Sequence, residues 1–312
     1  MSAQRFFLSD GRLHLNHGPI DLIIEAFGGE GEVAAAYEQA WARFPSVLSE
    51  LTAEFKTLRQ PIADRMPALS GPVARRMAAA VWPYRAQYIT PMAAVAGAVA
   101  EEMLAALIEG RQLRKAYVND GGDIALHLSP GEHFRAGIVG DLAAPAIDGR
   151  VTVEAESAVR GIATSGSGGR SFSLGIADAV TVLAETAAKA DAAATVIANA
   201  VNIEDEQIER APARSIDPDS DLGDMPVTVA VGDLSIDEVR HALDAGTLVA
   251  ERLAQDGSID AAVLLLRGER RVVTSDENRY PQISFDRGRH LPRGRAQSRA
   301  RAQARGGAGG HP

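Results

Sequence analysis

The chain has 312 residues, of which 46% are hydrophobic, 23% charged and 5% aromatic. This composition is typical of a globular protein with one large or two modest domains, and it excludes disorder throughout. The absence of cysteine excludes disulfides, thiolate metal sites and a cysteine nucleophile, and it fits a reducing compartment. The longest weakly polar run, residues 91–100, ends at Glu101 and Glu102. Because no signal-like or membrane-length segment is evident, we expect no membrane association and a cytoplasmic location.

Charge is distributed unevenly between the body of the chain and its end. Residues 287–312 carry seven arginines and no acidic residue, whereas the rest holds 25 basic and 41 acidic residues, a formal net charge of −16. The end has almost no apolar residue to bury, so we expect residues 286–312 to form a disordered Arg/Gly-rich tail. The acidic body argues against nucleic acid as the main partner, and no aromatic residue interleaves the arginines. The sequence leaves open whether subunits form a homodimer.

The first half of the chain predicts strands followed by helices. Residues 12–24 alternate between apolar and polar and predict two strands broken at Gly18-Pro19. Residues 28–59 are rich in alanine and predict two helices, because Pro45 interrupts the pattern. A helix is expected from about residue 72 to 82. The best-marked helix runs from Thr90-Pro91, an N-cap and first-turn proline, to Gly110.

The second half predicts hairpins interleaved with helices. Residues 115–128 read as strand, Gly-rich turn and strand, and a further strand is expected near residues 151–153. Residues 161–175 contain five glycines and predict a loop or long turn. The remaining predictions are a strand at 179–184, a helix at 185–200, a surface excursion at 203–225, a strand at 226–231, a helix at 235–255 and a hairpin at 261–274. The hairpins favour an α+β fold with mixed or antiparallel sheets in one domain, residues 1–285, with two intimately packed halves as an alternative.

Asp191 and Thr195 are the strongest candidate for a metal site. They stand four residues apart on a predicted helix, so both side chains lie on one face. A carboxylate and a hydroxyl oxygen are ligands that Mg²⁺ accepts. The alternative, favoured by spacing alone, is that Asp191 caps its own helical segment and Thr195 bonds back to its own helix.

Two glycine-containing segments are candidates for binding an anion. The loop at 161–175 offers backbone amides, hydroxyls and Arg170 to a phosphate, although a flexible turn explains it equally well. The segment Asn119-Asp120-Gly121-Gly122-Asp123 allows close approach of a ligand, but a hairpin turn needs none. His14 and His17 lie three apart on a predicted strand and should face opposite sides, so they are poor joint metal ligands.

Four segments, in order, resemble the ApbE superfamily, and specifically its branch of bacterial and archaeal proteins of unassigned function. They are TPMAAVAGAVAE at 90–101, AYVNDGGDIALHL at 116–128, GIATSGSGGRSFSLGIADAVTVLA at 161–184 and ADAAATVIANAV at 190–201. The similarity runs from about residue 5 to 275 and implies a T-fold-like α+β architecture with a buried cleft. Characterised members are Mg²⁺-dependent flavin transferases that move FMN from FAD onto a protein hydroxyl, alongside relatives that bind or hydrolyse FAD.

The resemblance assigns roles to individual residues. It makes Asp191, Thr195 and the backbone carbonyl of Ala163 the metal ligands, which reverses the preference for the capping alternative. The resemblance places Asn119, Gly121, Gly122, Thr164, Ser165 and Gly166 near the ligand, and the composition of the glycine-rich loop adds Arg170 as a further ligand-binding residue. If the protein is an enzyme, Asp123 or Asp178 is the available base.

Departures from the family pattern limit what is expected of the chemistry. The transferases carry a His-x-Ile-Asp-Pro-x-Thr-Gly segment whose histidine helps deprotonate the acceptor, and a lysine where this chain has Glu101 and Glu102. No histidine lies between His133 and His241, so flavin transfer by the usual route is in doubt. We therefore expect a Mg²⁺-dependent enzyme that hydrolyses or transfers part of a flavin-like, nucleotide-like or other anionic small molecule. The alternative is a flavin-binding or assembly protein without catalysis.

Overall fold

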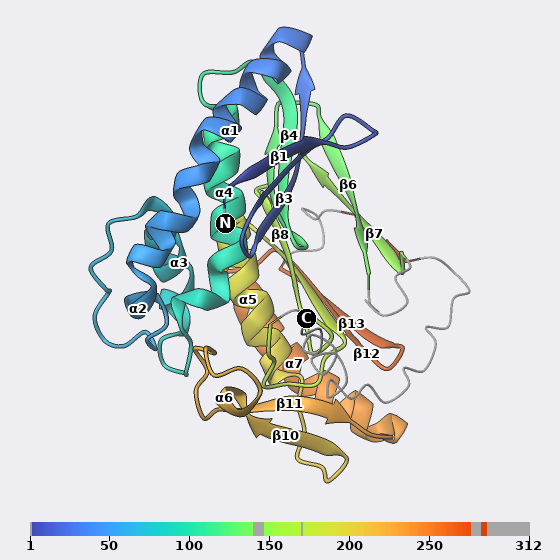
Figure 1. The fold of residues 1–312 in the computed structure, drawn as a ribbon. Coiled ribbons are helices and arrows are strands. Elements are labelled where there is room, and N and C mark those ends of the chain that lie inside the picture. Colours follow the sequence, from blue (N-terminus) through green and yellow to red (C-terminus); the bar gives the residue numbers. More distant parts are fainter. Residues whose placement is uncertain (1, 140–146, 170, 276–281, 286–312) are drawn as a thin grey trace, which may run out of the picture.

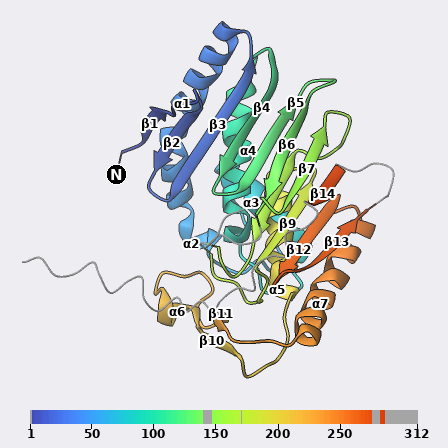
Figure 2. The same ribbon diagram turned by 90° about the vertical axis from the view of Figure 1, so that its right-hand side faces the viewer.

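The computed structural model describes residues 2–139, 147–169, 171–275 and 282–285. Arg170 and the tail at 286–312, for which the sequence predicts ligand binding and disorder respectively, lie outside the described residues. Helices cover one face of a nine-stranded sheet, and a three-stranded sheet lies over part of the other face (Figures 1 and 2). The architecture is α+β, as the sequence predicts.

Every pair of neighbouring strands in these sheets is antiparallel. In spatial order the large sheet contains β1 (Gln4–Phe7), β2 (Leu13–His17), β3 (Ile20–Gly28), β4 (Leu113–Asp120), β5 (Asp123–Leu128), β8 (Gly161–Ser165), β9 (Ala179–Ala184), β12 (Ala261–Leu266) and β13 (Glu269–Thr274). The small sheet contains β14 (Gln282–Phe285), β7 (Gly149–Glu154) and β6 (His133–Ile138). A separate pair is formed by β10 (Ile208–Pro212) and β11 (Pro226–Val231).

The long helices pack on one side of the large sheet, and a four-residue helix at 213–216 contacts β10 instead. In chain order the helices are α1 (Glu30–Ala53), α2 (Phe55–Leu58), α3 (Pro72–Val81), α4 (Val95–Ile108), α5 (Ala187–Ala200), α6 (Ala213–Ile216) and α7 (Ile236–Gln255), with short 3₁₀ turns η1 (Trp82–Tyr84) and η2 (Pro91–Ala94). By length and composition alone, Pro91–Ile108 is apolar enough to cross a membrane. Residues 91–100, the run noted in the sequence, are only part of this segment and therefore did not indicate it. The segment Pro91–Ile108 is 50% buried inside the protein and contacts α1, α5 and strands β4 and β5, as a core helix does.

Two sequence predictions are wrong. Pro45 does not divide the helical stretch, because α1 continues through it. The buried side chains of Phe44 and Val47 hold the helix against the core on both sides of the proline. Residues 161–165 are not loop: they form β8, which lies between β5 and β9. A Cβ on Gly161 would fall 2.1 Å from the carbonyl carbon of Thr186, so this glycine allows close packing of the strand against the start of α5.

Alternation along the strands sorts the side chains onto two faces. On β4, Ala116, Val118 and Asp120 are buried, and the first two belong to the core beneath the helices. Tyr117 packs against the smaller core beneath the three-stranded sheet, and Asn119 lies on the same face by alternation. Asp120 is therefore directed at the helical layer, at the end of β4 next to the turn.

Candidate functional site

The candidate metal residues lie on α5, whose position against α4 depends on a glycine. A Cβ on Gly97 would fall 2.3 Å from the carbonyl oxygen of Ala187, so only glycine lets the two backbones approach so closely. The helices run in opposite directions and overlap near their N-terminal ends (Figure 1). Thr186 is the N-cap of α5, and its side chain accepts a hydrogen bond from the amide of Lys189.

Each of these helices supplies a carboxylate that caps the other. The Asp191 Oδ2 atom accepts a hydrogen bond of 3.0 Å from the amide of Gly97, in the first turn of α4, whose own N-cap residue, Ala94, offers no side chain. The Glu101 Oε1 atom accepts a hydrogen bond of 2.7 Å from the amide of Ala188, in the first turn of α5. Carboxylates at helix N-termini are stabilised by the free amides and by the helix dipole. The alternative that Asp191 caps its own helical segment is therefore wrong: Asp191 caps α4, and Thr186 caps α5.

Asp191 lies in an environment that disfavours its charge. Burial raises the pKa of Asp191 to about 7, the nearby Asp120 carboxyl adds to the rise, and the Gly97 amide opposes it. Asp120 is itself 5% exposed. Two carboxyls near one another, Asp120 buried and Asp191 partly exposed, form a place where a divalent cation is electrostatically favoured.

Thr195 follows Asp191 by one helical turn and is partly exposed. Its hydroxyl makes no hydrogen bond to any other described residue, so it does not bond back to the carbonyl of Asp191. Asn199, one further turn along, accepts a 2.9 Å hydrogen bond from the amide of Leu174. These three residues form a polar stripe on α5, and its far end anchors the glycine-rich segment.

The end of the large sheet brings further candidates to the same side. Gly121 and Gly122 both have positive φ, 64° and 118°, as a two-residue type I′ turn requires, and Asp120 pairs with Asp123 across it. Directly paired side chains share a face, so Asp123 also points toward the helices. Its Oδ1 atom accepts a 3.1 Å hydrogen bond from the amide of Thr164 on β8.

The residues of the Ala-Thr-Ser-Gly segment divide between the two faces of the sheet. Ala163 belongs to the core beneath the helices, so it faces α5, and by alternation Ser165 lies on the same side. The hydroxyl of Thr164 is 2.9 Å from that of Thr181 on the opposite face. Thr164 therefore contacts Asp123 through its backbone amide, and its side chain lies on the other face of the sheet.

Packing accounts for several glycines of this segment. A Cβ on Gly166 would fall 2.4 Å from the carbonyl oxygen of Asp178, and one on Gly175 would fall 2.1 Å from that of Ala198. A Cβ on Gly168 would meet nothing within 4 Å. The amides of Ser167 and Gly169 donate to the carbonyls of Ala177 and Gly166, so the anion-cradle prediction applies best to the amide of Gly168 itself.

Asn119 and Asp178, two further candidates, are engaged in local structure. The Asn119 Oδ1 atom accepts a 2.8 Å hydrogen bond from the amide of Gly122, which stabilises the turn. The Asp178 Oδ2 atom accepts a 2.5 Å hydrogen bond from the amide of Arg267, a residue with positive φ in the β12–β13 turn. A catalytic role for Asp178 stays a prediction, whereas its contact with the turn is visible.

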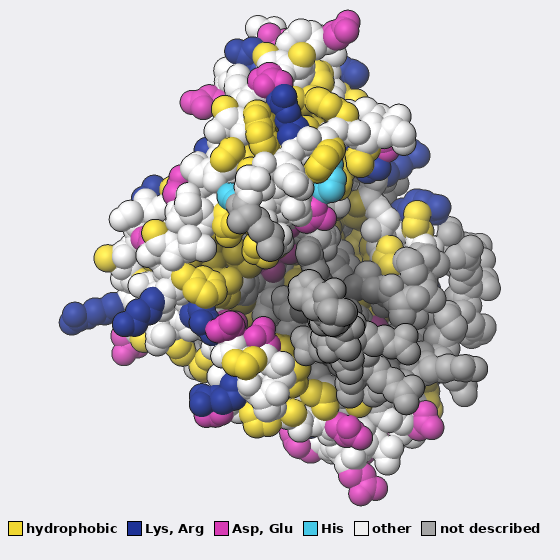
Figure 3. All heavy atoms as spheres, in the orientation of Figure 1, with side chains coloured by type: hydrophobic (Ala, Val, Ile, Leu, Met, Phe, Trp, Pro, Cys, Tyr) yellow, Lys and Arg dark blue, Asp and Glu magenta, His cyan; other side chains and the backbone are white. Residues whose placement is uncertain are grey.

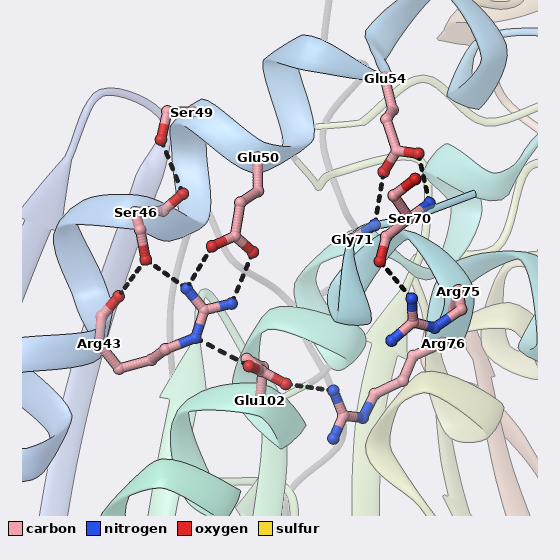
Figure 4. A network of polar contacts seen from close by, with 10 residues as sticks. All are labelled: Arg43, Ser46, Ser49, Glu50, Glu54, Ser70, Gly71, Arg75, Arg76 and Glu102. Carbon is pink, nitrogen blue, oxygen red and sulfur yellow. Dashed lines mark hydrogen bonds and ion pairs between the residues drawn. The ribbon is translucent and has the colours of Figure 1, made fainter.

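An ion-pair network fixes α4 relative to α1 and α3 (Figure 4). Glu102 bonds to the guanidinium groups of Arg43, at 2.8 Å, and Arg76. Arg43 also makes a bidentate contact of 2.8 and 2.7 Å with Glu50, and this contact holds the pKa of Glu50 below its ordinary value. Glu101 lies 3.5 Å from Arg76. The two glutamates that replace the family's lysine thus have structural partners.

Sequence reasoning names Asp120 and Glu101 but misses their roles at this site, the approach of Asp120 to Asp191 and the capping of α5 by Glu101. Asp120 shares the parity of Ala116 and Val118 on β4, which was the available signal for its burial. The contact of Glu101 with Ala188 joins residues 87 positions apart, and no local pattern indicates it. His14 and His17 lie on opposite faces, as predicted: His14 bonds to Asp21 at 2.5 Å, whereas His17 packs against Phe44 on the helical side.

The described residues contain no group of three or more His, Asp or Glu placed to hold a metal ion. A cation at Asp191 would therefore have few protein carboxylates and would need neutral oxygens from Thr195, backbone or a ligand. Mg²⁺ accepts this arrangement, since it commonly binds one or two carboxylates together with phosphate oxygens. On the face shown in Figure 3, acidic and basic side chains of the described residues are interspersed with hydrophobic ones.

Sequence comparison finds relatives among archaeal proteins whose names state no activity. The UPF0280 protein MK0206 of Methanopyrus kandleri is 37% identical over 161 residues, covering 50% of this chain and 61% of that protein. A UPF0280 protein of Methanothermobacter thermautotrophicus is 36% identical over 175 residues, covering 53% and 61%. The matched part thus spans about three fifths of the length of these curated relatives.

Structure comparison finds similarity to ApbE proteins. The ApbE protein of Thermotoga maritima gives a TM-score of 0.42 at 12% identity, covering 88% of this chain and 97% of that one. The apo form of the flavinyl transferase ApbE of Pseudomonas stutzeri gives 0.43 at 12% identity, covering 88% and 94%. Similarity at this level carries no argument about activity. A family model described as "AbpE bacteria" matches residues 5–272, and the chain therefore belongs to that family, in agreement with the resemblance seen in the sequence.

Proposed function

We propose that the protein binds a flavin nucleotide together with Mg²⁺ and hydrolyses its pyrophosphate bond. The observation that carries the proposal is the proximity of two carboxyls, the buried Asp120 and the partly exposed Asp191, one helical turn before Thr195, whose hydroxyl makes no hydrogen bond to another described residue. Family membership supports a flavin nucleotide as the ligand.

In this proposal Asp191, Thr195 and the carbonyl of Ala163 hold the cation. When bound, Mg²⁺ neutralises phosphate charge and polarises a phosphoryl oxygen. The amide of Gly168 donates to a phosphate oxygen, and Asp123, held by the Thr164 amide, accepts the proton of the attacking water. The water oxygen forms a bond to one phosphorus as the bridging P–O bond breaks, so FAD would yield FMN and AMP.

The test is incubation of the purified chain with FAD, with and without Mg²⁺, followed by chromatographic separation of FAD, FMN and AMP. We expect FMN and AMP in equal amounts only with Mg²⁺, and loss of both in Asp191→Ala and Asp123→Asn. Lys189→Ala, an exposed position of the same helix, is the matched control and should keep activity.

Binding and catalysis are separated by calorimetry with Mg²⁺ and FAD. Mg²⁺-dependent FAD binding without products would leave the metal and ligand site standing and refute hydrolysis, which favours the non-catalytic flavin-binding alternative. Unchanged Mg²⁺ affinity in Asp191→Ala would refute the site itself.

A further inference from the structure

A cavity lies between the large sheet and strand β6, on the face opposite Asp191. Its volume is about 660 Å³, within the range of small-molecule pockets. The sheet forms its floor and residues 133–137 of β6 form its roof. Neither the metal site nor the proposed hydrolysis uses this cavity.

The floor is built in register from three rows of side chains. The row next to the Gly-Gly turn runs across β4, β5 and β8: Asn119 pairs with Ile124, and Ile124 pairs with Ile162. The second row pairs Tyr117 with Glu25 and Leu126, and the third pairs Lys115 with Phe27. The β5 and β8 side of the floor is therefore apolar, whereas Glu25 on β3 adds a carboxylate to the second row and further polar groups stand at the two ends.

Aromatic rings surround the end farther from the turn. Phe134 of the roof lies 6.1 Å from Phe27 and 5.7 Å from Tyr117 between ring centroids, edge-on to the latter. All three rings are only partly buried. Partly exposed aromatic faces lining a hollow offer stacking surface to a flat ligand.

The hydrogen-bonding groups at the two ends are donors. The Lys115 ammonium lies 5.1 and 5.0 Å from the Phe27 and Phe134 rings, 3.0 Å from the carbonyl of His133 and 3.4 Å from Glu132. These contacts use two of its three N–H groups, leaving one for a ligand. The Asn119 side chain uses its oxygen on Gly122, and its amide nitrogen makes no hydrogen bond to another described residue. The two donors stand four residues apart on one strand, about 13 Å.

We infer that this cavity is a metal-independent binding site for a planar heteroaromatic molecule of two or three fused rings that carries hydrogen-bond acceptors on its edges. The ring lies on Ile124, Leu126 and Ile162 beneath Phe134. Acceptors at its two ends receive hydrogen bonds from Lys115 and Asn119.

Riboflavin is a suitable probe, because it has a flat acceptor-bearing ring and no phosphate for a metal to bind. Calorimetry on the full chain should give the same Kd with Mg²⁺ and with a chelator. Phe134→Ala, which removes the roof, and Lys115→Met, which removes a donor, should each weaken binding about tenfold or more. Phe6→Ala, at a 50% exposed phenylalanine of the same sheet, and Asp191→Ala should leave the Kd unchanged.

Methyl NMR of the unaltered chain tests the location without any substitution. Riboflavin should shift the methyl signals of Ile124, Leu126 and Ile162 and leave that of Ile197, on α5, in place. Absence of riboflavin binding, shifts confined to α5, or an affinity that follows Mg²⁺ or Asp191 would each overturn the inference. The first outcome leaves the metal site untouched, so the two proposals fail separately.

Discussion

Replacing Glu101 by alanine tests the mutual capping of α4 and α5. The carboxylate accepts the Ala188 amide at 2.7 Å, and Ala188 is 2% exposed, so water does not readily replace the lost acceptor. A capping side chain contributes about 1 kcal/mol, and a buried amide left without a partner costs about 1–3 kcal/mol. Since both figures describe one contact, we expect the free energy of unfolding to fall by about 2 kcal/mol.

Urea denaturation measures this loss, and two variants sharpen it. Glu101→Gln keeps an acceptor oxygen, so its free energy of unfolding should fall by less than half of the decrease expected for Glu101→Ala. Lys189→Ala removes an exposed pair with Glu185, which precedes the N-cap of α5, and should change stability by about 0.5 kcal/mol or less. If Glu101→Ala were as stable as Lys189→Ala, the carboxylate would not be capping α5 in solution.

Three further predictions concern neighbouring features. Gly97→Ala should destabilise the chain by about 1–3 kcal/mol in urea, because its Cβ would lie 2.3 Å from the Ala187 carbonyl oxygen; unchanged stability would exclude this close approach. Since the pKa of Asp191 is raised to about 7, this carboxyl is mostly protonated at pH 6, and Mg²⁺ affinity should be about tenfold weaker there than at pH 8. Because the folded state favours the protonated carboxyl, the free energy of unfolding of the metal-free chain should fall as pH rises from about 4 through 7. A flat profile in calorimetry and in pH-dependent urea titrations would contradict that assignment. Pro45→Ala should stabilise α1 by about 1–2 kcal/mol by restoring an amide donor, and a lower melting temperature would show that the helix needs the proline.

Local patterns in the sequence predict the fold well where a turn or helix end is determined by the residues of that element alone. The positive φ of Gly121 and Gly122 and the Ser235–Glu238 capping box of α7 follow from turn and cap chemistry. Pro45 was misread because core contacts of Phe44 and Val47 outweigh the missing hydrogen bond. Such packing depends on distant segments, so no local pattern reveals it.

The sequence likewise identified candidate residues of the site but not the contacts that they make with distant segments. The i, i+4 spacing of Asp191 and Thr195, with the family resemblance, was enough to select them. It could not show that Asp191 caps α4 or that Asp120 approaches it, because both contacts join segments far apart in the chain. Gly161 and Gly166 suggested a flexible loop, whereas both allow close backbone packing.

The order of strands in the large sheet has a consequence for how the chain folds. The first five strands are neighbours in space, but helices α1 to α4 lie between β3 and β4 in the chain. Short turns join β1 to β3 and β4 to β5, whereas the β3–β4 pairing joins residues up to 98 positions apart, so this part of the sheet forms only after α4 has been made. Its exposed edge then waits for β8 and β9, and α5 arrives only after them. While the chain is being synthesised, the carboxylates on β4 and α5 are separate for the time the ribosome takes to add some 70 residues. A ribosome-bound chain ending near residue 130 should therefore be partly protected from proteases yet unable to take up a metal ion.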